Sequence, residues 1–233
     1  MPDPLVSIVV PAYNEARFIE DVLRRVAAVP FRREIVVVDD GSSDGTADLV
    51  EAMRAEIDGL RVLRRPANAG KGAAVREGIA ATEGDFVVIQ DADLEYDPKD
   101  LPKLLEPLFE GRADVVYGTR LRGGEPQRAH LFWHHTANRM LSLLTNVLYN
   151  TTLSDMEVGY KAFRGDLVRG IRLVSDDFRF EPEVTAKVLR HDNLRLYEVP
   201  ISYYGRTFDE GKKITWRDGV KAVYALIRFR FSG

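Results

Sequence analysis

FVVIQDADLEYDP, residues 86–98, runs from a short apolar segment straight into a cluster of acidic side chains. Apolar residues on consecutive positions are typical of a strand that is covered on both faces of a sheet. Asp91, Asp93, Glu95 and Asp97 then follow within seven residues. Carboxylates this close repel one another unless solvent, hydrogen bonds or a cation absorb their charge. The stretch therefore predicts a buried strand that ends at a polar site.

Apolar runs of the same kind recur along the first 120 residues and alternate with helical patterns. Apolar side chains at helical spacing predict one helix over residues 18–26 and another over 101–108, with Pro98 near the start of the second. This alternation predicts right-handed βαβ units and a Rossmann-like α/β fold, in which helices flank a mostly parallel sheet. The predicted strands of this part span residues 5–10, 34–38, 60–63, 85–90 and 114–117.

Polar, turn-rich segments follow three of these predicted strands. They are PAYNEA (11–16), DDGSSDGT (39–46) and DADLEYDP (91–98). Ligands of open parallel sheets bind beyond the carboxyl ends of the strands. We therefore expect these three segments to lie together and to form the site.

The pattern loosens in the second half of the chain. An amphipathic segment over 130–149 is followed by a helix-like FEPEVTAKVLR (180–190), a strand LRLYEVPIS (194–202) and a terminal helix. No internal repeat, low-complexity tract or long linker interrupts this order. We expect a single domain over residues 1–233, in which the C-terminal half completes a site begun by the first half.

The composition excludes several classes of protein. A formal net charge of −3 over 233 residues gives no indication of nucleic-acid binding. The chain has no cysteine, which excludes disulfides, thiolate catalysis and zinc-thiolate sites. None of its histidines stands in a context typical of a catalytic triad; they are His130, His134, His135 and His191.

Neither export nor a membrane span is predicted. The N-terminal MPDPLVSIVVPAYNE lacks the basic region and long apolar region of a signal peptide. No window approaches the roughly 18–20 uninterrupted apolar residues that a membrane-spanning helix needs. We expect a cytoplasmic protein, and contact with a membrane surface stays open.

The acidic cluster has two interpretations. Asp93 and Asp97 could cap the helix near Pro98 while the other two acids are solvated, but capping explains only one or two of the four. Alternatively, Mg²⁺ or Mn²⁺ takes oxygen ligands from one or two carboxylates together with phosphate oxygens and water. Side chains two residues apart point to the same side of an extended backbone, so Asp93 with Asp91 or Glu95 can reach one ion. We favour the cation, because it also suits a departing diphosphate.

Two glycine-containing turns leave their interpretation open. Asp39 and Asp40 could form an Asx turn before a helix, or a carboxylate there could accept hydrogen bonds from a ribose or a base. NAGKGAAVREG (68–78) lacks the spacing of a phosphate-binding P-loop. Its glycines indicate a close approach of backbones, and whether Lys71 reaches a phosphate is undecided.

Cations and aromatic residues of the second half could complete such a site. Arg120 follows the fifth predicted strand, and Arg206, Lys212 and Lys213 lie in a later loop. Surface solvation is the usual fate of such cations, but beside an anionic substrate they would balance its charge. The terminal helix WRDGVKAVYALIRFRF mixes aromatic and basic residues. That mixture is typical of a membrane interface, and also of an ordinary docking helix.

The combined motifs resemble glycosyltransferase family 2. The resemblance is to the branch of dolichyl-phosphate mannose synthase-like and polyprenyl-phosphate glucose synthase-like enzymes, and it extends over residues 5–228. It implies a GT-A fold, a nucleotide-sugar donor, Mg²⁺ or Mn²⁺, and transfer to a polyprenyl phosphate with inversion at the anomeric carbon. Residues 1–122 would then bind the nucleotide sugar, and residues 123–233 would form the acceptor side. The motifs are IVVPAYNE, IVVVDDGSSDGT, QDADLEYDP, GTR, DMEVGYKAFR, FEPEVTAKVL and EVPISYYGRTFDEGKKITWRDG.

The resemblance also implies roles for individual residues. Asp93 and Glu95 would ligate the metal, although relatives often carry Gln at the position of Glu95. Asp91, Asp93 and Arg120 would be the catalytic residues. The donor would be bound by Pro11, Tyr13, Glu15, Val38, Asp40, Asp91, Ala92 and Asp93. The phosphates of donor or acceptor would be bound by Arg120, Arg206 and Lys212.

The identity of the substrates depends on finer features. The stretch EVGYK (157–161) stands where mannose synthases have SGF, and no QxxRW signature of processive synthases is present. We therefore expect UDP-glucose as donor and a peripheral enzyme at the cytoplasmic face of the membrane. Alternatives are GDP-mannose, UDP-GlcNAc or a soluble acceptor. Two other classes of protein are alternatives. A sugar nucleotidyltransferase would carry a Gly-rich loop after the first strand. A non-catalytic nucleotide-sugar-binding module would not need both the acidic cluster and the cations of the second half.

Overall fold

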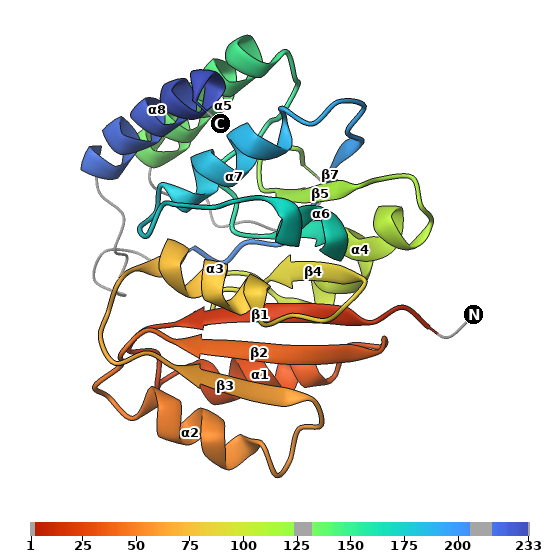
Figure 1. Ribbon diagram of the computed structural model, residues 1–233, viewed down its shortest axis with the longest axis vertical. Helices are drawn as coiled ribbons and strands as arrows, with labels where there is room; N and C mark the ends of the chain where they lie inside the picture. Colours follow the sequence, from red (N-terminus) through yellow and green to blue (C-terminus); the bar gives the residue numbers. More distant parts are fainter. Residues whose placement is uncertain (1–2, 124–131, 206–215, 233) are drawn as a thin grey trace.

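The computed structural model describes residues 3–123, 132–205 and 216–232 (Figure 1). A seven-stranded sheet forms its centre. The strands are β1 (Val6–Ala12), β2 (Arg33–Asp39), β3 (Leu60–Arg64), β4 (Phe86–Ile89), β5 (Val115–Thr119), β6 (Lys161–Arg164) and β7 (Leu196–Pro200). The helices are α1 (Ile19–Ala27), α2 (Thr46–Met53), α3 (Lys71–Ala80), the short 3₁₀ helix η1 (Pro98–Asp100), α4 (Leu101–Phe109), α5 (Phe132–Tyr149), α6 (Gly165–Gly170), α7 (Phe180–Val188) and α8 (Trp216–Phe231).

The sheet is mostly parallel, as the sequence predicts. Its strand order is β3-β2-β1-β4-β6-β5-β7, and only β6 runs antiparallel to its two neighbours. The register places Ile8 of β1 between Ile35 of β2 and Val88 of β4. These side chains are fully buried, because helices cover both faces of the sheet. Helices α3 and α6 lie in front of the sheet in Figure 1, and α1 and α4 lie behind it.

The apolar spacing of the helices is confirmed by their burial. Helix α1 turns Ile19, Val22, Leu23 and Val26 toward the core. Helix α4 does the same with Leu101, Leu104, Leu105 and Leu108. Asp97 accepts a hydrogen bond from the backbone nitrogen of Lys99 and so caps η1, directly before Pro98.

Strand β6 is the strand of the described sheet that the sequence did not predict. It has four residues and carries Lys161 and Arg164 at its ends, so no apolar run marks it. It lies between β4 and β5, with Ala162 opposite Val88 on one side and Val116 on the other. Because β6 is antiparallel, its first residue lies at the edge where β4 and β5 end. The segment before β6 is therefore brought to the predicted site.

Helices α5 and α8 lie side by side at the end of the molecule drawn at the top of Figure 1, next to α7. Leu141, Met156, Ala222 and Leu226 form a small apolar core where α5 and α8 meet. Within the described ranges, no helix is both long and apolar enough to cross a membrane. The division into a donor half and an acceptor half stays a prediction.

Candidate active site

The predicted polar segments lie together at the carboxyl edge of the sheet, after β1, β2 and β4. The first two are joined directly. The backbone nitrogen of Asn14 donates to the hydroxyl of Ser42 at 2.9 Å, and that of Ala16 donates to the Asp44 carboxylate at 3.0 Å. Such links fix two loops against each other without any ligand. The edge is therefore pre-formed around the strand ends.

Asp39, the last residue of β2, and Asp40, which follows it, have different surroundings. Asp40 is buried, and its carboxylate accepts hydrogen bonds from the backbone nitrogens of Ala69 and Gly70 at 3.1 and 2.7 Å. Asp39 accepts one from the backbone nitrogen of Ser42 at 3.1 Å. Its other oxygen is buried and has no hydrogen-bond partner among the residues described here. A buried acceptor without a donor is costly, and an N–H or hydroxyl group of a bound nucleoside would satisfy it.

The four acids of the opening stretch each have separate partners. Asp93 accepts a hydrogen bond from the backbone nitrogen of Glu95 at 3.1 Å. Glu95 accepts one from the Tyr203 hydroxyl at 2.9 Å. Asp91 forms an ion pair with Lys71 at 2.8 Å. Asp97 caps η1, as the capping interpretation expects for that residue, and the cation interpretation of the other acids stays a prediction.

The side chain of Lys71 points toward the carboxylate of Asp91. It also contacts Glu181 of α7 at 3.2 Å. Burial alone would lower the pKa of Lys71, but the charges of Asp91 and Glu181 outweigh burial and raise this pKa well above its usual range. Lys71 is consequently a fixed positive charge at the strand end.

Arg120 lies at the same edge, in a bidentate ion pair with Asp155 in which both hydrogen bonds measure 2.7 Å. Its guanidinium group lies 4.9 Å from the centre of the Tyr203 ring. Although burial would raise the pKa of Asp155, the charge of Arg120 lowers it below its usual value. Arg120 is thus brought to the site, and its predicted contact with phosphate stays a prediction.

Glu157 is a site residue that the sequence analysis missed. It lies in the segment before β6, and its Oε1 atom is buried without a hydrogen-bond partner in the described part of the chain. Burial, together with the charge of Glu181, raises the pKa of Glu157 to about 7, although Lys161 and Arg120 oppose this. Its signal in the sequence is a single acid inside the otherwise apolar stretch MEVGY (156–160).

The predicted donor-binding residues are distributed along this edge. Tyr13 is exposed, Glu15 and Ala92 are buried, and Val38 is fully buried in a small apolar cluster with Val36 and Ala74. Their roles, like those of Pro11, Asp40 and Asp91, stay predictions. Arg206 and Lys212 fall outside the described residues.

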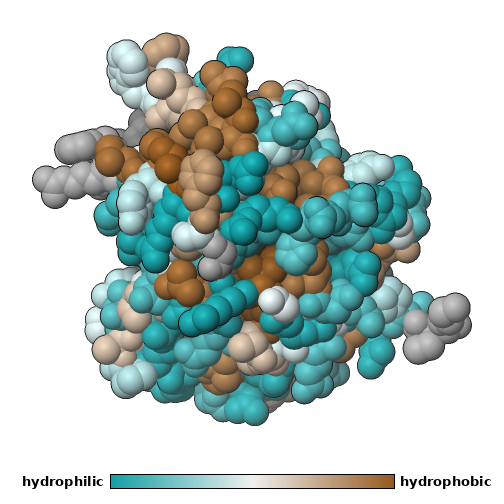
Figure 2. All heavy atoms as spheres, turned by 45° about the horizontal axis from the view of Figure 1, so that its top comes forward, coloured by the Kyte–Doolittle hydropathy of each residue, from teal (hydrophilic) through white to brown (hydrophobic). Residues whose placement is uncertain are grey.

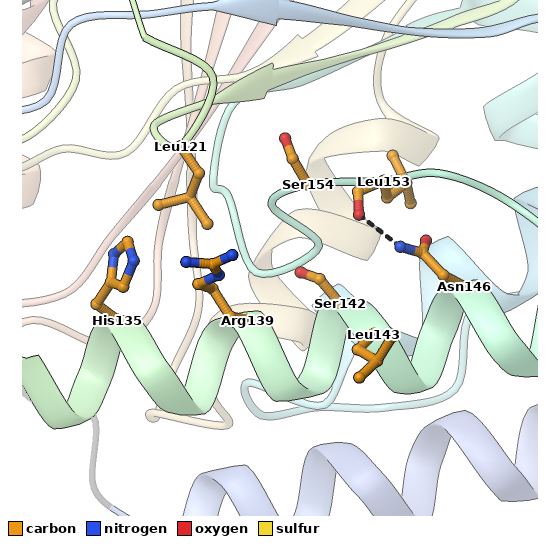
Figure 3. Close-up of a pocket in the computed structure, with 8 residues that line it drawn as sticks. All are labelled: Leu121, His135, Arg139, Ser142, Leu143, Asn146, Leu153 and Ser154. Carbon is orange, nitrogen blue, oxygen red and sulfur yellow. Dashed lines mark hydrogen bonds between the residues drawn. The ribbon is translucent and has the colours of Figure 1, made fainter.

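A groove of about 290 Å³ opens beside the Arg120 loop, between helix α5 and the segments after β5 and α5 (Figure 3). Figure 3 shows His135 and Arg139 reaching from α5 toward Leu121, and Asn146 hydrogen-bonded to the backbone of Leu153. The sequence indicated α5 as amphipathic but did not predict the groove. Its lining residues are Leu121, His135, Arg139, Ser142, Leu143, Asn146, Leu153 and Ser154.

The sheet order, the helices on both faces and the acids at the strand ends define a GT-A fold glycosyltransferase. Residues 7–172 match the model of the family described as Glycosyl transferase family 2. The chain therefore belongs to glycosyl transferase family 2, which confirms the resemblance of its motifs.

Relatives of this chain are named for transfer to polyprenyl phosphates. Undecaprenyl-phosphate mannosyltransferase of Micrococcus luteus is 33% identical over 89% of this chain and 86% of its own length. Dodecaprenyl-phosphate galacturonate synthase of Rhizobium johnstonii is 30% identical over 86% of this chain. Undecaprenyl-phosphate 4-deoxy-4-formamido-L-arabinose transferase of Pseudomonas aeruginosa is 32% identical over 91% of it. This chain spans 59% and 61% of the length of the last two relatives.

Solved structures confirm the fold. Glucosyl-3-phosphoglycerate synthase of Mycobacterium tuberculosis, in complex with Mn²⁺, UDP and glucosyl-3-phosphoglycerate, superposes with a TM-score of 0.72 at 24% identity. The match covers 97% of this chain and 80% of that one. Mannosyl-3-phosphoglycerate synthase of Rubrobacter xylanophilus gives a TM-score of 0.72 at 21% identity, over 97% of this chain and 72% of that one.

The raised pKa of Glu157 predicts a pH dependence of stability. In the unfolded chain this carboxyl group has a pKa near 4.5, so between pH 4.5 and 7 the folded state holds a proton that the unfolded state has lost. The resulting stability is complete below pH 4.5 and is lost as the pH rises through 7. In urea unfolding, Glu157→Gln should reduce the decline in unfolding free energy between pH 5 and 8 by about 2 kcal/mol.

Glu56→Gln, at an exposed position, is the control and should follow the wild type at every pH. Equal pH dependence of Glu157→Gln and the wild type would contradict the raised pKa.

Proposed function

We propose that this protein is a metal-dependent, inverting glycosyltransferase that moves a hexose from UDP-glucose to a polyprenyl phosphate at the cytoplasmic face of a membrane. The observation that carries this proposal is the groove along α5, which joins cationic and apolar side chains beside Leu121, the residue after Arg120. A polyprenyl phosphate has a matching division into an anionic head and an apolar tail.

The groove offers both parts of such an acceptor a partner. Arg139 and His135 can donate hydrogen bonds to a phosphate, while Leu143 and Leu153 offer apolar contact. A second, larger depression of about 650 Å³ shares His135, Arg139 and Leu143 with the first. It continues along α5 past Phe132 and Met140. The two depressions together line α5 with cationic and apolar side chains.

Unpartnered apolar side chains on α5 and α8 support contact with a membrane. Phe132, Met140, Leu143 and Val147 are exposed at helical spacing on α5. Figure 2 shows brown, apolar atoms gathered on the end of the molecule that these helices form. An apolar patch flanked by basic side chains is typical of a helix lying in the membrane interface. Among the side chains of α8 that the structure describes, the exposed apolar ones are Val220, Val223, Tyr224, Ile227 and Phe231.

The names of the relatives support a polyprenyl phosphate as the acceptor more strongly than they support any one sugar as the transferred group. Three of them are named for undecaprenyl or dodecaprenyl phosphate, but each for a different sugar. UDP-glucose is our preferred donor because EVGYK replaces SGF, and because the glucosyl-3-phosphoglycerate synthase of similar fold was solved with UDP. GDP-mannose is the second candidate, which the 33% identical mannosyltransferase favours.

The carboxylates of Asp93 and Glu95 provide the oxygen donors that Mg²⁺ and Mn²⁺ prefer. No set of three acidic or histidine side chains forms a complete metal site within residues 3–123, 132–205 and 216–232. Metals at phosphate sites usually take one or two carboxylates and complete their shell with phosphate and water. When bound, the ion would neutralise charge that develops on the leaving diphosphate.

Apart from neutralising the leaving diphosphate, the site needs to align the acceptor phosphate with the anomeric carbon of the donor. An acceptor phosphate is already anionic at neutral pH, so its oxygen can attack the anomeric carbon without a strong general base. Arg120 would attract the acceptor phosphate, and Asp91 would lie against the donor. In the sequence none of the four histidines stands in a context typical of a catalytic triad, which suits this division of roles.

A donor panel tests the proposed reaction. Purified protein is incubated with UDP-glucose, GDP-mannose or UDP-GlcNAc and a short polyprenyl phosphate, and the product is measured by mass and by anomeric NMR. We expect one hexose on the phosphate, from UDP-glucose, with inversion. EDTA or Asp93→Ala should reduce turnover by about 100-fold or more, because a metal contributes several kcal/mol at a leaving diphosphate. Undiminished turnover in EDTA would remove the metal mechanism.

Arg139→Glu tests the groove. Reversal of the charge should raise the KM for polyprenyl phosphate about tenfold or more, since a charge-assisted hydrogen bond contributes about 1.5–3 kcal/mol. The KM for the donor should not change. Arg172→Glu, the same change at an exposed position outside the groove, is the control. Equal acceptor kinetics in wild type and Arg139→Glu would place the acceptor elsewhere.

Flotation with vesicles tests the membrane surface. We expect the wild type to float with vesicles that contain anionic lipid and to float less in high salt. Val147→Glu combined with Ile227→Glu should abolish flotation, because both changes place charge in the apolar patch. Val174→Glu alters an exposed apolar residue outside α5 and α8, and this variant should float like the wild type. Absence of wild-type flotation would favour a soluble acceptor.

A further inference from the structure

Four charged side chains form a continuous, alternating series beneath the acidic strand end. Asp91 pairs with Lys71 at 2.8 Å, Lys71 contacts Glu181 at 3.2 Å, and Glu181 pairs with the fully buried Lys161. The series joins the end of β4 to the start of α3, to α7 and to β6. Lys161 is also held by the backbone oxygen of Val158.

The backbone beneath Lys71 is fixed by close packing. A Cβ atom on Gly72 would lie 2.4 Å from the backbone oxygen of Ser175, and one on Gly70 would lie 2.5 Å from that of Asp176. Gly70 also has a φ of +106°, which L-residues rarely adopt. Glu183 in turn holds the nitrogen of Ser175 at 2.7 Å. The two glycines thus seat the start of α3 directly against the segment before α7, which sets the point from which Lys71 reaches Asp91.

Gly159 closes the other side of Asp91. A Cβ atom on Gly159 would lie 2.5 Å from Oδ2 of Asp91 and 2.9 Å from the Tyr96 ring. The segment before β6 therefore crosses directly over the Asp91 carboxylate, while Lys71 holds its other oxygen, Oδ1. Asp91 nevertheless keeps about a fifth of its side chain exposed. It is a fixed acid with a small open face.

The negative charges at the end of β4 affect whether a diphosphate can bind there. Asp91, Asp93 and Glu95 together carry three negative charges, which would repel an incoming diphosphate. Lys161 offsets Glu181, so the charge of Lys71 is left to compensate Asp91.

We propose that Lys71 is a positioning residue of the transfer site, which fixes the Asp91 carboxylate and cancels its charge so that a nucleoside diphosphate can bind beside it. The proposal rests on the proposed function only in that the donor carries a diphosphate. Lys71 acts through Asp91 and through its anchor Glu181, and it need not touch the substrate.

The test measures nucleotide binding and therefore needs no acceptor. UDP and GDP are titrated calorimetrically into the protein with Mn²⁺, and the nucleotide that the wild type binds more tightly serves as the probe. Lys71→Met should weaken its binding about tenfold or more, because an uncompensated carboxylate would face the diphosphate. Lys71→Arg keeps the charge and should restore most of the affinity. If Lys71→Met does not fold by circular dichroism, Lys71→Gln replaces it with the same expected loss.

Lys187→Met is the matched control. Lys187 is a lysine of similar exposure that pairs with buried Glu183 at 2.6 Å on α7, outside the strand end. Its loss should lower the Tm but leave the Kd for the nucleotide unchanged. A Kd that rises as much in Lys187→Met as in Lys71→Met would show that Lys71 is merely structural and overturn the proposal.

A double variant tests whether Lys71 acts through Asp91. In an Asp91→Asn background no carboxylate needs compensation, so Lys71→Met should change the Kd less than about twofold. A full additional loss would overturn the proposal, as would wild-type affinity in the single variant or binding of neither nucleotide by the wild type. Nucleotide binding without transfer to any polyprenyl phosphate would instead reject the proposed function and leave the role of Lys71 to be decided by the Kd.

Discussion

The buried ion pair between Arg120 and Asp155 is the interaction on which the carboxyl edge depends. Asp155 accepts two side-chain hydrogen bonds from Arg120 and one, at 2.6 Å, from Asn138 of α5. One carboxylate thereby joins the end of β5, the segment before β6 and the helix that lines the groove. Removal of one partner from such a pair usually costs about 3–5 kcal/mol, because the other charge stays buried and uncompensated. The same ion pair therefore stabilises both the site and the groove.

Aromatic rings extend this connection to the acids. Tyr203 lies under the Arg120 guanidinium and donates its hydroxyl to Glu95, while Tyr96 stacks on Tyr160 with ring centres 4.8 Å apart. The nitrogen of Gly159 donates to the Tyr96 hydroxyl at 3.0 Å. The loop that carries the acids is therefore packed against segments more than 60 residues later in the chain. Its shape is set by tertiary contacts, and local turn chemistry alone would not maintain it.

The sequence predicted those parts of the molecule whose cause is local. Apolar runs marked six strands, and the cap at Asp97 followed from its place before Pro98. Strand β6 was not predicted because two of its four residues are charged. The burial of Lys161 depends on Glu181, which lies 20 residues later in the chain. The same limit applies to Lys71, whose partner lies 110 residues away. Motif order predicted the family, but the pairing of distant charges could be found only in the folded chain.

The position of β6 in the sheet also affects when the sheet can fold during synthesis of the chain. In the described structure β5 hydrogen-bonds only to β6 and β7, both of which come later in the chain. A nascent chain that ends before residue 161 would thus leave β5 with no strand beside it and β4 with an open edge. Strand β6, the last but one to be synthesised, is the strand that joins β4 to β5 in the sheet. Catalytic competence would therefore arise late in synthesis and in one step, and a prematurely terminated chain would be a substrate for chaperones and proteases.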